Sequence, residues 1–208
     1  MPIGKNECRG EASKDRIVRE FDLLAIGRFA IASDVTIDGC CGELSGEQIV
    51  FQYTSKTNPK DEGQFSVGED CAQQFLSRIR QPMPEEVNPF ASSKGSSSVA
   101  AGGVHSASGA AAAKWHPLNK EVYRAIMLWC SLNGQIPKYS TARILEQIAK
   151  NPGQKVDDKQ VYELFKVLAT YKKSLADLVQ AASSKHTLKN FSFPQLTAMA
   201  SKNWIDLP

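Results

Sequence analysis

The chain has 208 residues, of which 42% are hydrophobic and 23% charged, values that are ordinary for a globular protein and argue against wholesale disorder. Residues 1–19 are polar and charged without an apolar core, which excludes a standard secretory signal. No run reaches the roughly 18 apolar residues of a membrane helix. We therefore expect a cytoplasmic protein that does not contact a membrane.

The charge is unevenly divided along the chain, although the formal total is only +3. Residues 1–90 contain 10 Lys and Arg against 15 Asp and Glu, whereas residues 116–208 contain 13 against 7. Such asymmetry is a compositional hint that the basic half binds a polyanion. The alternative is that these lysines only make a small helical domain soluble.

The first 90 residues have the pattern of a small α+β domain. Residues 1–20 are predicted to be a polar arm that becomes ordered near Ile17. Apolar alternation predicts a half-buried strand at residues 29–37 and a hairpin with strands at 48–54 and 64–67. A helix follows from Cys71 to Ile79, with its apolar residues on one face. The prediction is an acidic α+β domain over residues 1–90.

The rest of the chain divides into a linker and a helical part. Residues 91–114 contain eight Ala, seven Ser and four Gly, a composition typical of a flexible tether. Helical periodicity and caps then predict helices at residues 118–132, from 140 or 141 to 148, from 157 or 158 to 168, at 174–182, and after Phe193 and Pro194. Their short connections predict a separate, basic, all-α domain over residues 115–208.

The cysteines are the residues most able to carry chemistry. Their number is odd, at five, and no export signal accompanies them, which argues against a disulfide framework. Tetrahedral zinc takes four thiolates, and a thiolate is favoured in the first turn of a helix. The candidate zinc ligands are Cys8, Cys40, Cys41 and Cys71.

The segment from about residue 35 to residue 75 resembles the treble-clef group of small zinc-binding modules. In that group a Cys-x-x-Cys-Gly knuckle, a hairpin and a helix with further ligands hold one ion. Here the knuckle reads Cys40, Cys41, Gly42, and Gln74 stands where a second helical ligand is expected. The resemblance implies a treble-clef-like shape and a degenerate zinc site. The alternative is that Cys41 and Cys71 are small core residues and the metal has been lost.

Catalytic motifs are sparse. Cys71 at a helix start could be a nucleophile, but a thiol needs a base, and the histidines are at positions 105, 116 and 186, in the linker or beyond it. The sequence has no Walker loop, dinucleotide glycine pattern or His-Glu-x-x-His motif. We therefore expect no enzymatic activity and identify no small-molecule substrate.

Candidate contacts to phosphate come from the basic half. Arg124 and Arg143 are the arginines after residue 115, so few side chains can make bidentate hydrogen bonds to guanine. We therefore expect sequence-independent contact to the nucleic-acid backbone. The aromatic residues Trp115, Trp129, Tyr139 and Tyr171 are expected at the core or the domain edge. The candidates are Lys138, Arg143, Lys150, Lys155, Lys159, Lys166, Lys172, Lys173, Lys185 and Lys189.

These patterns favour a non-enzymatic, two-domain binding or regulatory protein. Its expected partner is nucleic acid or a protein of a nucleic-acid-processing machine, as in an accessory protein of a phage or mobile element. One alternative is a protein-only inhibitor or scaffold that docks a partner with each domain. A more remote alternative is a cysteine-dependent enzyme.

Overall fold

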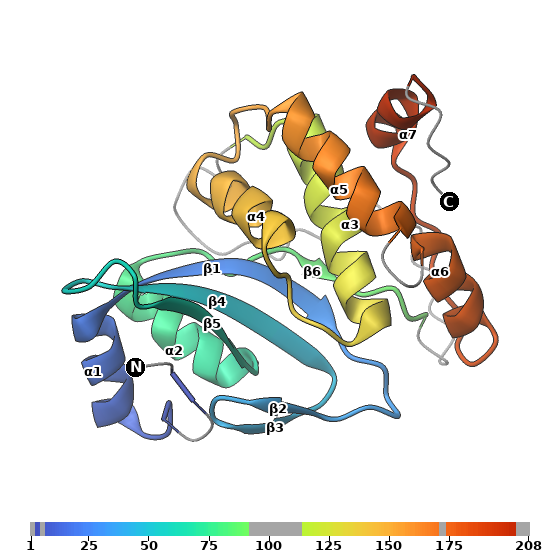
Figure 1. Ribbon diagram of the computed structural model, residues 1–208. Helices are drawn as coiled ribbons and strands as arrows, with labels where there is room; N and C mark the ends of the chain where they lie inside the picture. Colours follow the sequence, from blue (N-terminus) through green and yellow to red (C-terminus); the bar gives the residue numbers. More distant parts are fainter. Residues whose placement is uncertain (1–2, 5–6, 92–113, 171–173, 203–208) are drawn as a thin grey trace.

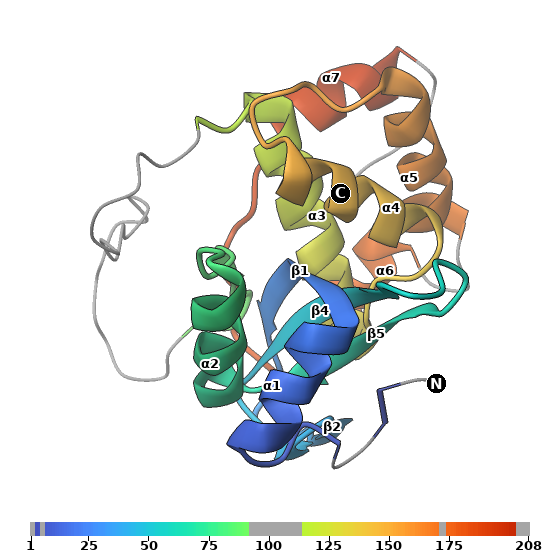
Figure 2. The same ribbon diagram turned by 90° about the vertical axis from the view of Figure 1, so that its left-hand side faces the viewer.

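A four-stranded sheet lies between two layers of helices in the computed structural model, which describes residues 3–4, 7–91, 114–170 and 174–202 (Figure 1). Helices α1 (Glu11–Glu20) and α2 (Glu69–Ile79) cover one face, and the helices of the second half of the chain cover the other, as Figure 2 shows from the side. The predicted α+β class is confirmed.

The sheet is built almost entirely from the first half of the chain. Its strands stand in the order β5-β4-β1-β6, with β6 parallel to β1 and the other neighbours antiparallel, and β2 and β3 form a separate hairpin. The strands are β1 (Phe21–Ala30), β2 (Ile37–Gly39), β3 (Gly42–Leu44), β4 (Glu47–Ser55), β5 (Glu62–Val67) and β6 (Glu86–Val87).

Two expectations for this half were wrong. Residues 11–20 form helix α1 rather than a polar arm, although the helix buries only Lys14 and Ile17, so its apolar periodicity is faint. The strand expected at residues 29–37 lies earlier, as β1. The hairpin strands and the helix at Cys71 are confirmed with wider bounds, and α2 begins two residues earlier than predicted, at Glu69.

An irregularity in β1 explains why its alternation was misread. Opposite β4, Ala25 pairs with Phe51 and Gly27 with Val50, so Ile26 is an extra residue in the ladder. A bulge of this kind shifts the period-2 pattern by one position. As a result, Ile26 and Phe29 both join the core of the second helical layer despite their odd spacing.

The second half of the chain forms the helices that the sequence predicted. Their periodicity is strong because each buries a continuous apolar stripe. At the start of α6 the Ser174 side chain accepts from the Asp177 backbone N–H, and the Asp177 side chain accepts from the Ser174 backbone N–H. These two bonds form a capping box. The helices are α3 (Pro117–Asn133), α4 (Ser140–Lys150), α5 (Asp158–Thr170), α6 (Leu175–Ser183) and α7 (Pro194–Ser201).

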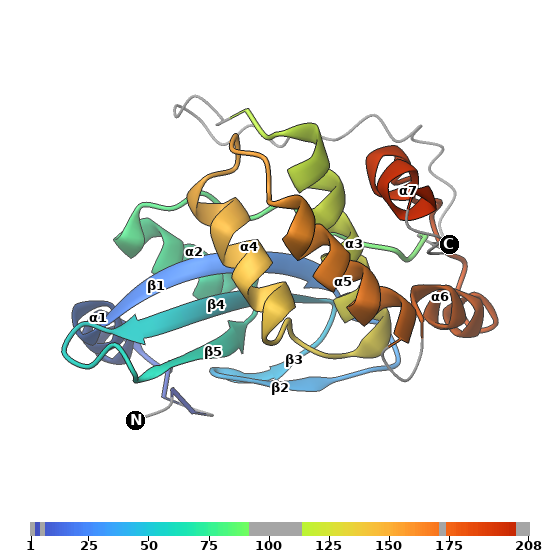
Figure 3. The same ribbon diagram turned by 45° about the horizontal axis from the view of Figure 1, so that its top comes forward.

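These helices do not form a body separate from the sheet. One buried cluster joins Ile26, Phe29, Val50 and Val87 of the strands to residues of α3 through α7. Figure 3 shows α3 and α4 lying across β1 and β4. A Cβ atom at Gly27 would lie 2.5 Å from Met127 Sδ, so the glycine permits this close approach.

Polar contacts reinforce the same junction. The Tyr123 hydroxyl donates to the Glu85 carbonyl at 2.6 Å and accepts from the Arg28 N–H at 3.1 Å, and Ser131 Oγ donates to the Ala30 carbonyl at 2.6 Å. A backbone bridge pairs Phe90 with Leu188, in the segment between α6 and α7. The halves thus share a core in the folded chain, and the expected division into domains over residues 1–90 and 115–208 stays a prediction.

The expected linker, residues 91–114, lies almost wholly outside the described residues, and its predicted character is not tested. No helix among the described residues is long and apolar enough to cross a membrane.

Candidate functional site

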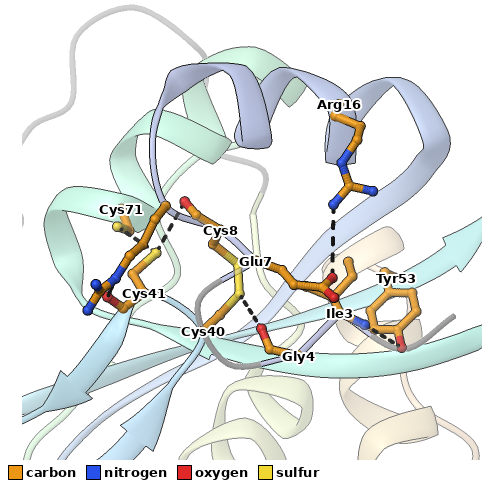
Figure 4. The surroundings of a disulfide bond; sticks show 10 residues. Ile3, Gly4, Glu7, Cys8, Arg16, Cys40, Cys41, Tyr53 and Cys71 are labelled. Carbon is orange, nitrogen blue, oxygen red and sulfur yellow. Dashed lines mark hydrogen bonds and ion pairs between the residues drawn. A yellow bond between two sulfur atoms is a disulfide. The ribbon is translucent and has the colours of Figure 1, made fainter.

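The structure brings the four predicted ligand cysteines to one corner of the molecule (Figure 4). Cys40 and Cys41 form the turn between β2 and β3, Cys8 precedes α1, and Cys71 lies in the first turn of α2. They form two pairs, and Cys130, the remaining cysteine, is buried elsewhere, within α3.

Cys8 and Cys40 are joined by a disulfide with a Cα to Cα distance of 5.6 Å. Both residues are buried, with 0% and 4% of their surface exposed. This bond corrects the expectation of reduced thiols throughout, because the number of cysteines in a sequence cannot show which of them meet. Disulfide sulfurs carry no thiolate, so in this state neither residue can serve as a zinc ligand.

Cys41 and Cys71 are free thiols in contact with each other. Their Sγ atoms lie 3.0 Å apart, and the Cys41 thiol also donates to the Cys8 carbonyl at 3.5 Å. Both side chains are partly exposed and line a pocket of about 200 Å³ at the start of α2. The pair is therefore within reach of a small molecule, unlike the disulfide beside it.

Burial, as the larger cause, and the hydrogen bond with Cys71 together raise the pKa of Cys41 to about 12. Two cations act in the opposite direction: Lys14, which is itself buried, and Arg9, whose Nε donates to the Cys41 carbonyl at 3.0 Å. Cys41 is therefore a protonated thiol at neutral pH despite the positive charges around it.

This raised pKa predicts slow alkylation of Cys41. At pH 8 its thiolate fraction should be about 1000-fold lower than that of an ordinary cysteine, and the iodoacetamide rate should fall in proportion. The rate should climb only as the pH approaches the raised pKa, and Cys71→Ala should increase it because the hydrogen bond is lost. Mass spectrometry of the peptide that contains Cys41 measures this alkylation rate. Full reaction near pH 9 would contradict the burial argument.

Zinc binding stays a prediction. Among the residues that the structure describes, no group of three or more His, Cys, Asp or Glu side chains is placed to hold a metal ion. The turn of Cys40 and Cys41, strands β4 and β5 and helix α2 follow one another in the chain, and the treble-clef resemblance stays a prediction. Of the predicted ligands, only Cys41 and Cys71 remain thiols, and metal analysis of the fully reduced protein tests the four-thiolate site.

The predicted phosphate contacts lie on the surface of the helical layer, except that Lys172 and Lys173 fall outside the described residues. Lys150 pairs with Glu146 and Lys155 with Asp158. Other cations have no acidic partner among the described residues, and these are Lys138, Arg143, Lys159, Lys185 and Lys189. Arg143 on α4 and Lys159 on α5, with Lys138 just before α4, therefore offer positive charge that forms no ion pair among the described residues, and Lys185 and Lys189 do so between α6 and α7.

Tyr139 stands between two of these unpaired cations. Its surface is 88% exposed, so the expectation that it belongs to the core or the domain edge was wrong. Its backbone also has φ 50° and ψ −117°, a left-handed conformation that costs a non-glycine residue of the order of 1–3 kcal/mol. An exposed aromatic in a strained turn is a candidate recognition residue.

Neighbouring groups hold the turn in place. Thr141 Oγ1 accepts from the Lys138 N–H at 2.9 Å and donates to the Lys138 carbonyl at 2.7 Å. Lys138 in turn lines a groove of about 510 Å³ that runs from the loop after α3 to the edge strand β5, with Gln64, Ser66 and Gln135 among its polar residues. Lys138 therefore links the groove, which it lines, to the exposed ring of Tyr139, its neighbour in the chain.

Sequence reasoning identified the cysteines and the lysines but missed Tyr139, Arg9 and Lys14. One signal for Tyr139 was available: it precedes the apolar register of α4, which begins at Thr141, and so cannot share the buried stripe. No protein-family profile matches the chain, and no significant match is found among curated proteins or solved structures.

Proposed function

We propose that the protein is a non-enzymatic binding protein whose helical layer contacts the backbone and bases of single-stranded nucleic acid without reading their sequence. The observation that carries this proposal is the exposed, strained Tyr139, with Lys138 and Arg143 beside it and no acidic partner for either cation among the described residues.

The combination has a physical rationale. Proteins that bind single strands without sequence preference stack bases on aromatic side chains and follow the backbone with cations, and every base has a face to stack. Tyr139 supplies the ring, and Lys138 and Arg143 supply point charges on either side of it. The two bonds between Thr141 and Lys138 hold the backbone of the turn in place, which lowers the entropy lost on binding.

The groove beside Lys138 supports the same ligand. Its volume, about 510 Å³, is in the range of sites that take small organic groups. The side-chain amides of Gln64 and Gln135 can donate to and accept from bases or sugars of any identity, and the Asp38 carboxylate in the same lining favours contact through these amides over contact to phosphate. A duplex keeps its base faces stacked inside, so a strand with free bases makes better use of the exposed ring.

The test measures binding of a fluorescent oligothymidylate of about 20 nucleotides by anisotropy across a salt series. Tyr139→Ala should weaken binding about 5- to 150-fold, the equivalent of 1–3 kcal/mol for one stacked base. Lys138→Gln with Arg143→Gln should reduce the slope of log K against log salt by about 1.4, because each phosphate contact contributes about 0.7.

Matched variants separate recognition from folding. Tyr139→Phe keeps the ring and should bind as the parent does, whereas Tyr139→Gly relieves the left-handed strain and should lose binding without losing stability. Lys60→Gln removes an exposed lysine from the loop between β4 and β5 and should leave the slope unchanged. Oligonucleotide binding that ignores Tyr139, or no binding at low salt, would reject the proposal and favour the protein-docking alternative.

A further inference from the structure

The free thiols of Cys41 and Cys71 are arranged for a bond that they have not made. Their sulfur atoms lie 3.0 Å apart, whereas a disulfide bond is about 2.0 Å long, so an approach of about 1 Å would join them. They come from different elements, the β2–β3 turn and the first turn of α2, and are brought together by the fold rather than by sequence proximity.

The surroundings suit thiol chemistry more than inert packing. Reactive cysteines lie in partly exposed, electropositive sites and at helix N-termini. Here both side chains open on the pocket of about 200 Å³, and Arg9 and Lys14 place positive charge beside Cys41. Three carboxylates, those of Glu43, Glu69 and Asp70, line the same pocket and oppose this effect.

We propose that Cys41 and Cys71 form a thiol–disulfide exchange site that takes a low-molecular-weight disulfide and is itself oxidised to a second protein disulfide. This inference is independent of nucleic-acid binding. The Cys71 thiolate attacks one sulfur of the small disulfide, whose bond breaks as one small thiolate leaves. Cys41 then gives its proton to that thiolate and attacks the Cys71 sulfur, which expels the second one. Two protein thiols and one small disulfide become one protein disulfide and two small thiols.

The order of attack follows from the two environments. The Cys41 thiol donates its hydrogen to the Cys8 carbonyl at 3.5 Å and its sulfur accepts from Cys71 at 3.0 Å, so it is the poorer first nucleophile. In the second step Cys41 attacks the neighbouring sulfur of Cys71. This proximity raises the effective concentration of the attacking thiol by orders of magnitude. The neutral thiol therefore acts as the resolving partner.

The other cysteines are excluded from this exchange by burial. Cys8 and Cys40 are 0% and 4% exposed, and Cys130 is 0% exposed, so a dissolved disulfide cannot reach them in the folded chain. The reaction is confined to Cys41 and Cys71. Its structural consequence would be a covalent tie between the β2–β3 hairpin and α2, at a corner already held by the buried disulfide.

The experiment treats the full-length protein with glutathione disulfide at neutral pH and maps the products by mass spectrometry without reduction. The expected product links Cys41 to Cys71 and releases two glutathione molecules per chain. Cys41→Ser should stop at a mixed disulfide on Cys71 and accumulate it at least about 10-fold above the parent, because the resolving thiol is missing. Cys71→Ser should react at least about 10-fold more slowly.

Cys130→Ser is the matched control, since it removes a thiol that the reagent should not reach, and its kinetics should equal those of the parent. Parent protein that stays unlinked under oxidising excess would overturn the proposal. So would a bond from Cys71 to Cys8 or Cys40, or a Cys41→Ser variant that accumulates no mixed disulfide while its far-ultraviolet circular dichroism matches the parent.

Discussion

Replacing Phe29 by alanine should lower the free energy of unfolding by about 3–5 kcal/mol, the usual cost of removing a fully buried phenylalanine. The ring is 2% exposed and belongs to β1, yet it packs in the cluster formed by the C-terminal helices. Its loss should therefore destabilise both halves of the chain together.

The tryptophans make this coupling measurable. They lie at positions 115, 129 and 204, all in the C-terminal half, so their fluorescence reports the unfolding of that half alone. In Phe29→Ala the urea midpoint of the fluorescence transition should fall by more than about 1 M, given slopes of 1–3 kcal/mol per molar for proteins of ordinary size. Far-ultraviolet circular dichroism should give the same midpoint, because a shared core unfolds as one unit.

Val35→Ala is a suitable control, because Val35 is a large apolar residue that is 38% exposed and should change stability by no more than about 0.5 kcal/mol. If the fluorescence midpoint of Phe29→Ala stayed at the parent value while circular dichroism shifted, the two halves would unfold separately. That outcome would restore the two-body organisation expected from the sequence.

The sequence carried a signal for this shared core that domain-level composition obscured. Ile49, Val50 and Phe51 are consecutive residues of β4, and all are 0% exposed. A strand with one solvent-exposed face alternates apolar and polar residues, whereas an unbroken apolar run is typical of a strand covered on both faces. The second cover could only come from elements beyond the Ala, Ser and Gly segment, because α1 and α2 occupy the other face.

The helices of the second half were predictable because each follows one periodicity without interruption. Strand β1 was not, because the extra residue Ile26 interrupts its alternation: every second residue is buried from Phe21 to Ala25, but the three consecutive residues 25–27 are all buried. Helix α1 was missed for a different reason: it buries only Lys14 and Ile17, and a buried lysine reads as surface in any hydropathy pattern. Local irregularity, and not weak propensity, limited these predictions.

The candidate site was predictable in composition and not in pairing. Four cysteines in a turn and at a helix start indicated one cluster, and the fold places them together. Adjacent residues cannot readily direct both side chains to one point, and Cys40 and Cys41 accordingly meet different partners, Cys8 and Cys71. For Tyr139 the sequence signalled only that it precedes the buried stripe of α4, because its exposure and backbone strain belong to the folded turn.

Opening the Cys8–Cys40 disulfide should have the other large effect, a loss of about 3–4 kcal/mol in the free energy of unfolding. The bond closes a loop of sequence separation 32, and a cross-link of that span restricts the unfolded chain by this amount in the chain-entropy description. The paired variant Cys8→Ala, Cys40→Ala should show the loss directly in urea denaturation followed by tryptophan fluorescence.

Reducing agent separates the cross-link from the packing of the two side chains. The parent should lose stability when a phosphine reductant is added, whereas the paired alanine variant should be indifferent to it. Cys41→Ser with Cys71→Ser should retain the full response, because it leaves the buried disulfide intact. A parent whose midpoint does not move, although thiol titration counts all five cysteines as free, would show that the bond adds no stability. In that case the N-terminal segment would depend on the burial of Ile3 and on its N–H bond to the Tyr53 hydroxyl at 3.3 Å.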